Sequence, residues 1–75
     1  MRQEGLKKGV PDLFLMVPRR GYHGLIIEMK VGRNKPTEEQ VGWLDKLEAQ
    51  GYRAVALWGA DEVIAEISDY LGVEQ

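Results

Sequence analysis

Two short apolar runs near the start of the chain place the strongest limits on its fold. The first covers residues 13–17, and the second extends from Leu25 to about Lys30. Pro18 and Gly21 between them are typical of a turn, so this spacing predicts a β-hairpin. Neither run is long enough for a membrane span or a signal-peptide core. We therefore expect a soluble, cytoplasmic protein.

A helix is expected after the hairpin. Thr37 and Gln40 have the spacing of a capping box, with Thr37 as the N-cap. Gly51 is placed to end this helix. The helix would bury an apolar stripe that consists of Val41, Leu44 and Leu47.

The remaining sequence predicts a third strand and a second helix. Residues 53–58 have the pattern of a strand, and Asp61 would cap the helix after Gly59 and Ala60 turn the chain. A helix between the second and third strands implies a crossover, so we expect an α/β fold of the α+β type. Its sheet would be mixed and covered by the helices, in the order β-β-α-β-α. The buried face of the last helix would consist of Val63, Ile64, Ile67, Tyr70 and Leu71.

The chain is short enough to need additional support. Its 75 residues predict a single domain over residues 1–75, with a core that is only marginally sufficient. Because the sequence has no cysteine, neither a disulfide nor a thiolate metal site can provide that support. We therefore expect a partner subunit, as in a homodimer.

The charges are divided unevenly along the chain. Residues 1–36 contain eight basic and three acidic residues, a net charge of +5, whereas residues 37–75 have a net charge of −7. Such asymmetry favours a polyanionic partner for the first half. Two ordinary solvated faces are the alternative that charge alone leaves open.

Two acids lie within or beside the apolar runs. Side chains alternate across a strand, so Glu28 and Lys30 share one face, and hairpin pairing brings Asp12 beside Glu28. Two adjacent carboxylates repel each other, and a divalent cation such as Mg²⁺ between them removes that cost. Lys30 would then activate or orient a water, or stabilise charge on a phosphate. A neutralised pair of Glu28 and Lys30 on an exposed sheet face is the alternative.

These residues resemble a known family. Gly-Val-Pro-Asp at 9–12 and Glu-Met-Lys at 28–30, with a glutamine that opens the next helix, resemble the PD-(D/E)XK nuclease superfamily. The longer stretches 8–15 and 24–30, with Gln40 and Gly51-Tyr52, are similar to the virus-type replication-repair nuclease (VRR-NUC) domain. The likeness covers residues 5 to 71 and implies a restriction-endonuclease-like core.

The resemblance also implies roles for individual residues. Asp12, Glu28 and the backbone carbonyl of Met29 would bind Mg²⁺ or Mn²⁺, and Lys30 would activate or position the water. Family members place a glutamine at the edge of the active site, so Gln40 joins the candidate catalytic residues, although a purely structural capping role stays open. The implied activity is cleavage of DNA, selective for branched substrates such as Holliday junctions, by a homodimer of the kind found in phages.

The basic loops are the expected DNA-binding surface. They contribute Lys7, Lys8, Arg19, Arg20, Arg33 and Lys35. A nuclease-fold module that binds DNA or protein without cutting is the main alternative. The superfamily pattern begins with a helix that carries a glutamate, and we expect no such helix before Asp12 in this sequence. A minimal family member, a helix borrowed from a partner and a fragment of a longer protein are the explanations that stay open. Glu4 is the only acid before Asp12 and does not align with that glutamate, so the third carboxylate ligand of the pattern is unassigned.

The sequence is less specific about the roles of three aromatic residues and the single histidine. His23 is expected to be a solvated turn residue, and Tyr22 is either a turn residue or a DNA contact. Trp43 and Trp58 fit packing or a dimer interface better than stacking on bases.

Overall fold

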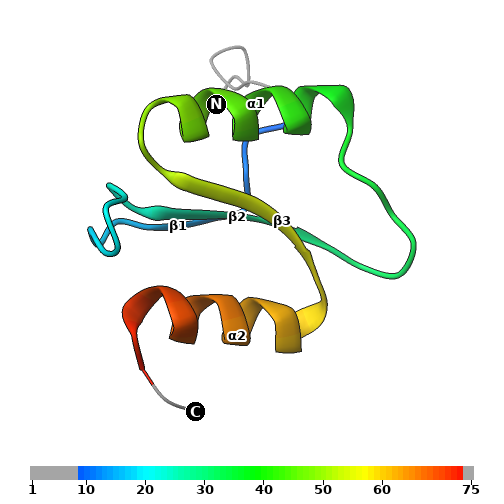
Figure 1. Cartoon of the computed structure of the whole chain (residues 1–75). Coiled ribbons are helices and arrows are strands. Elements are labelled where there is room, and N and C mark those ends of the chain that lie inside the picture. Colours follow the sequence, from blue (N-terminus) through cyan, green and yellow to red (C-terminus); the bar gives the residue numbers. More distant parts are fainter. Residues whose placement is uncertain (1–8, 74–75) are drawn as a thin grey trace, which may run out of the picture.

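The computed structural model describes residues 9–73 and has a three-layer arrangement. Its elements are β1 (Leu13–Leu15), β2 (Leu25–Lys30), α1 (Glu38–Ala49), β3 (Arg53–Trp58) and α2 (Gly59–Leu71). The helix α1 lies on one face of the sheet and α2 on the other (Figure 1). The predicted order β-β-α-β-α and the predicted mixed sheet are confirmed.

The central strand of the sheet is β2. It pairs antiparallel with β1 and parallel with β3, so the hairpin and the crossover are both present. Leu25, Ile26 and Ile27 are almost fully buried. A strand that is covered by a helix on each face has an apolar side chain at successive positions, as these three residues do. Glu28 in the same strand is therefore an exception that calls for a chemical explanation.

The strand β1 is shorter and more exposed than the sequence predicts. It ends at Leu15 instead of Val17, and Phe14 and Met16 are exposed. The chain turns at Arg20 and Gly21, which have φ angles of 55° and 86°. Two successive positive φ angles are typical of the tight turns that match the twist of a hairpin. Arg19 and Tyr22 close this turn with paired backbone hydrogen bonds of 3.2 and 2.8 Å.

The helix α2 contacts the hairpin from the face of the sheet opposite to α1. Tyr70 is fully buried, and its hydroxyl donates to the carbonyl of Val17 at 2.7 Å. The predicted buried face of α2 is wrong at Ile64, which is 55% exposed. The predicted stripe of α1 is likewise wrong at Val41, which is exposed because α1 packs mainly over β3.

The start of α2 also differs from the prediction. No loop separates β3 from α2, and Trp58 is the N-cap instead of Asp61. The carboxylate of Glu62, one turn into the helix, accepts from the backbone N–H of Trp58 at 2.9 Å. This carboxylate therefore pairs the backbone N–H of the N-cap residue itself, whereas an Asp61 cap would have accepted from an N–H two or three residues after Asp61. No helix within residues 9–73 is long and apolar enough to cross a bilayer.

Candidate active site

Strand pairing brings Asp12 to the carboxyl end of β2. Leu13 is the partner of Ile27, so the next pair outward joins Asp12 to Glu28. The backbone N–H of Asp12 donates to the carbonyl of Ile27 at 3.2 Å. Its carboxylate oxygen Oδ2 accepts from the backbone N–H of Met29 at 2.8 Å. The aspartate therefore continues the hydrogen bonding of β2 just before the start of β1.

Glu28 is a buried carboxylate with one oxygen paired and one unpaired. Its oxygen Oε2 accepts from Nε2 of Gln40 at 2.9 Å and lies 3.4 Å from Nζ of Lys30. Its other oxygen, Oε1, is buried without a hydrogen-bond partner. Burial raises the pKa of Glu28, and the neighbouring Asp12 carboxylate raises it further, whereas Lys30 lowers it. The site therefore disfavours the charge of Glu28 unless another cation is present.

Gln40 forms the predicted capping box and also contacts Glu28. The side-chain oxygen of Gln40 accepts from the backbone N–H of Thr37 at 2.8 Å. The backbone N–H of Gln40 donates to the Thr37 hydroxyl at 3.1 Å. This is the predicted capping box, and it uses only one end of the amide. The other end donates to Glu28. Gln40 thus caps α1 and contacts the central strand at the same time.

Lys30 lies beside the carboxylates at the end of β2. Its side chain is 13% exposed, so its ammonium group is only partly hydrated. The pair that it forms with Glu28 is largely buried and does not lie on an exposed sheet face. The amine is therefore available to a group that approaches Glu28, but it is not a freely solvated surface charge.

The oxygen donors fit a hard divalent cation. The unpaired Oε1 of Glu28 and the neighbouring Asp12 form a site where a cation would offset the cost of two adjacent carboxylates. The N–H of Met29 points to Asp12, and in a strand the carbonyl of the same residue points to the same side. Within residues 9–73, no cluster of three or more His, Cys, Asp or Glu side chains suits a metal ion. The described donors are therefore two carboxylates and one backbone carbonyl.

The candidate DNA-binding residues separate into two regions. Arg33 and Lys35 are exposed in the loop that leaves β2 directly after Lys30. Arg19 and Arg20 lie at the tip of the hairpin, which is at the other end of the sheet (Figure 1). Lys7 and Lys8 lie outside the described residues. The site and the loop of residues 31–36 therefore form one region, and the hairpin tip forms another.

Contacts already engage part of these basic groups. Arg20 forms an ion pair of 2.7 Å with Asp69 of α2, and both side chains are exposed. Arg19 donates to the carbonyl of Pro18 at 2.8 Å. The sequence does not predict the ion pair between Arg20 and Asp69, because the two residues are 49 positions apart and charged residues of both types are common on protein surfaces.

Trp58 holds the loop that carries Arg33 and Lys35. Its indole N–H donates to the carbonyl of Asn34 at 2.7 Å, and Trp58 is the strand partner of Lys30. The sequence did not reveal this role, since a tryptophan at a strand end is equally suited to packing. His23 is exposed, as expected of a turn residue, although its ring packs against Gly51 and lies edge-on to Tyr52 at 5.7 Å.

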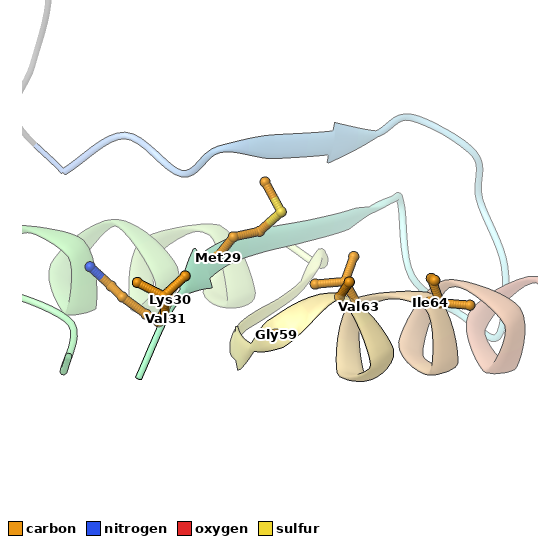
Figure 2. Close-up of a pocket in the computed structure, with 7 residues that line it drawn as sticks. Met29, Lys30, Val31, Gly59, Val63 and Ile64 are labelled. Carbon is orange, nitrogen blue, oxygen red and sulfur yellow. The ribbon is translucent and has the colours of Figure 1, made fainter. Parts of the chain in front are cut away.

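An apolar groove lies on the opposite side of the end of β2. Its volume is about 360 Å³, and α2 contributes one wall through Val63 and Ile64. Figure 2 shows Met29 beside this groove and Lys30 with its amine directed away from Val63 and Ile64. The groove lining includes Met29 and Lys30 but neither Asp12 nor Glu28. The groove therefore borders the carboxylate site without including either carboxylate.

Comparisons with known proteins agree on one family. The model of the VRR-NUC domain matches residues 2–61. A solved structure described as a VRR_NUC domain protein is 38% identical, with a TM-score of 0.87 over 97% of this chain. The match covers 61% of that solved chain, so the present sequence spans about three-fifths of its length. No curated protein matches the chain significantly. On the family match and the shared fold, the chain belongs to the VRR-NUC domain family of nucleases.

Proposed function

We propose that this chain is a divalent-metal-dependent DNA endonuclease that hydrolyses phosphodiester bonds and prefers branched DNA such as Holliday junctions. Membership of the VRR-NUC family supports a nuclease fold. The observation that carries the metal dependence is Oε1 of Glu28, a buried carboxylate oxygen without a partner beside Asp12. A carboxylate oxygen that is buried away from water beside a second carboxylate is costly, and a cation offsets that cost.

The proposed metal ligands are Asp12, Glu28 and the backbone carbonyl of Met29, and the ion is Mg²⁺ or Mn²⁺. When bound, the ion would supply Lewis-acid stabilisation of the phosphate oxygens. Asp12 is oriented for this role by the Met29 N–H, and Glu28 is oriented by Gln40. Each carboxylate therefore has one oxygen engaged by the protein and a second oxygen for the ligand.

Lys30 is the proposed residue that handles the attacking water. Its amine lies 3.4 Å from Glu28 in a largely buried setting, where a positive charge acts more strongly on a phosphate than in open water. It would orient the water or hold positive charge against the pentavalent transition state. Gln40 would act on this chemistry through Glu28.

The proposed DNA contacts begin with the loop after β2. Arg33 and Lys35 would hold the phosphate backbone beside the site, and Arg19 and Arg20 would contact DNA further along the sheet. Lys7 and Lys8 complete the proposed basic surface. A homodimer would place two such sites on one branched substrate, in keeping with the support that so short a chain needs.

A gel assay of four-way, flapped and linear DNA with Mg²⁺ or Mn²⁺ tests this function. We expect cleavage of the branched substrates, no cleavage in EDTA, and no cleavage by Asp12→Asn. Equal cutting of linear DNA would contradict the structure selectivity. Equal cutting by Asp12→Asn would contradict the site itself.

A nuclease-fold module that binds DNA without cutting is the second candidate. The observation that favours it is the donor set, which has only two clustered carboxylates within residues 9–73. Such a module would bind four-way DNA at low salt, yet Mn²⁺ would not bind at Asp12 and Glu28. Direct measurement of Mn²⁺ binding therefore separates the two candidates.

A further inference from the structure

We propose that the first turn of α1 is a platform that sets the positions of both carboxylates, with Thr37 and Gly9 as its positioning residues. This inference rests on the proposed metal site, but it concerns residues that contact the metal-ligand segments without binding the metal themselves. Neither Thr37 nor Gly9 supplies a side chain to the cation. Each acts through a neighbour, Thr37 through Gln40 and Gly9 through the segment that leads to Asp12.

The contact between α1 and Glu28 depends on the orientation of the Gln40 side-chain amide. The carboxamide of Gln40 can be placed with either its oxygen or its nitrogen toward Glu28, and only the nitrogen can donate to Oε2. The backbone N–H of Thr37 occupies the oxygen at 2.8 Å, which leaves Nε2 to meet Glu28 at 2.9 Å. The Thr37 hydroxyl accepts from the N–H of Gln40 at 3.1 Å and holds the same turn closed. The capping box thus selects the amide orientation that engages Oε2 and leaves Oε1 unpaired.

The position of Asp12 depends on the close approach of the backbone at Gly9 to the backbone of α1. Gly9 has a φ of +83°, and a Cβ at this position would lie 2.7 Å from the backbone nitrogen of Gln40. The segment that leads to Asp12 therefore rests directly on the first turn of α1. Pro11, which is buried and has a fixed φ, stiffens the short path from Gly9 to Asp12. A shift of this helical turn would move both carboxylates together.

Two variants of Thr37 separate positioning from stability. Thr37→Val removes the hydroxyl at nearly constant shape, and Thr37→Ser restores it. Both are made together with Gly42→Ala, because Gly42 faces open space in α1 and alanine there offsets the loss of helix stability. The Gly42→Ala protein is the reference. All measurements are made well below the melting temperature of each of the three proteins, which excludes unfolding as the cause of any difference.

The first measurement requires no metal. Solvent exchange of the Gln40 side-chain NH₂, followed by ¹⁵N NMR, reports directly on its bond to Glu28, with the exposed Gln50 amide as the internal standard. We expect Gln40 to be protected in the Gly42→Ala reference and in the serine variant. In the valine variant we expect its exchange to approach that of Gln50. Equal protection in the valine variant and the reference would overturn the role of Thr37.

The second measurement is Mn²⁺ affinity by calorimetry on the same proteins. We expect the valine variant to bind about 10-fold more weakly or worse, which is typical when a group behind a metal ligand is removed, and the serine variant to recover. Unchanged affinity would overturn the platform. If the parent protein binds no Mn²⁺, the proposed metal site fails, and the amide exchange alone decides the role of Thr37.

Gly9 is tested with a matched glycine. Gly9→Ala places a Cβ against α1, whereas Gly21→Ala has a similar positive φ of 86° but no atom within 4 Å. Both variants incur the same kind of backbone strain. We expect Gly9→Ala, and not Gly21→Ala, to weaken Mn²⁺ binding and to alter the exchange of the Gln40 amide. An equal response of both readouts in the two variants would show strain alone and overturn the role of Gly9.

Discussion

The side-chain amide of Gln40 donates to Oε2 of Glu28 at 2.9 Å and so joins the start of α1 to the central strand. The contact explains how a carboxylate is tolerated in a strand whose other inner residues are apolar. It satisfies one oxygen, Lys30 provides partial charge balance, and the second oxygen stays unpaired. The consequences for stability, catalysis and DNA binding can each be measured.

The raised pKa of Glu28 predicts how stability depends on pH without metal. A carboxyl group whose pKa is higher in the folded state binds more protons when folded, so the free energy of unfolding falls as pH rises. The fall begins at the unfolded-state pKa, close to the ordinary glutamate value, and ends above the folded-state pKa. We expect the stability of the parent relative to Glu28→Gln to decrease over this range in urea titrations with EDTA. A difference that is constant with pH would contradict the burial of this charge.

Lys30→Met should remove cleavage and retain metal binding. A residue that orients or deprotonates the attacking water contributes about 10²–10⁴-fold to the rate, so we expect at least a ~100-fold loss. The folded protein should lose about 1–3 kcal/mol, since a largely buried carboxylate loses a charged neighbour. Cleavage of four-way DNA and Mn²⁺ calorimetry on the same preparation check the two parts. Cleavage at the parental rate would remove Lys30 from the mechanism.

Two substitutions near the hairpin tip should change DNA affinity in opposite directions, because Arg19 would contact DNA and Asp69 pairs with Arg20. Arg19→Glu should weaken DNA binding and reduce the salt slope by about 0.9 for each phosphate that the protein no longer neutralises. Asp69→Asn should strengthen binding modestly, because it releases Arg20 from a 2.7 Å partner. Binding isotherms between about 50 and 200 mM salt measure both effects. An unchanged slope in Arg19→Glu would place the hairpin tip outside the DNA interface.

Tyr70→Phe tests the attachment of the hairpin to α2. The change removes the 2.7 Å bond to the Val17 carbonyl and keeps the buried ring, so we expect a loss of about 0.5–1.5 kcal/mol. Urea unfolding measures this loss. Because Tyr70 lies far along α2 from the carboxylates, Mn²⁺ affinity should not change. A loss of affinity as large as that in Asp12→Asn would contradict the separation of the two regions.

The parts of the fold that follow local rules could be predicted from the sequence. Alternation across β2 and the capping spacing of Thr37 and Gln40 depend on neighbouring residues only. The structure contains both, because Leu25 and Ile27 pack with Tyr70 of α2 whereas Glu28 bonds to α1. The same reasoning brought Asp12 beside Glu28, because hairpin pairing follows from a short connection. It also left Gln40 with two interpretations, and the structure shows the capping bond together with a second bond from the same amide to Glu28.

The errors arise where distant residues decide the outcome. Ile64 has the spacing of a buried position, yet α2 crosses the sheet in a way that leaves it exposed. Asp61 has a suitable type for an N-cap, but β3 runs directly into the helix, which begins at Gly59 and has no side-chain cap. The bonds of Trp58 to Asn34 and of Arg20 to Asp69 span 24 and 49 residues. No local pattern encodes such contacts.

The central claim is that Asp12 and Glu28 form one divalent cation site. Calorimetric titration of the parent, Asp12→Asn and Glu28→Gln with Mn²⁺ tests it most directly, because each substitution removes charge at nearly constant shape. We predict that the parent binds Mn²⁺ and that both variants lose this binding while they remain folded by circular dichroism. Parental affinity in either folded variant would contradict the claim.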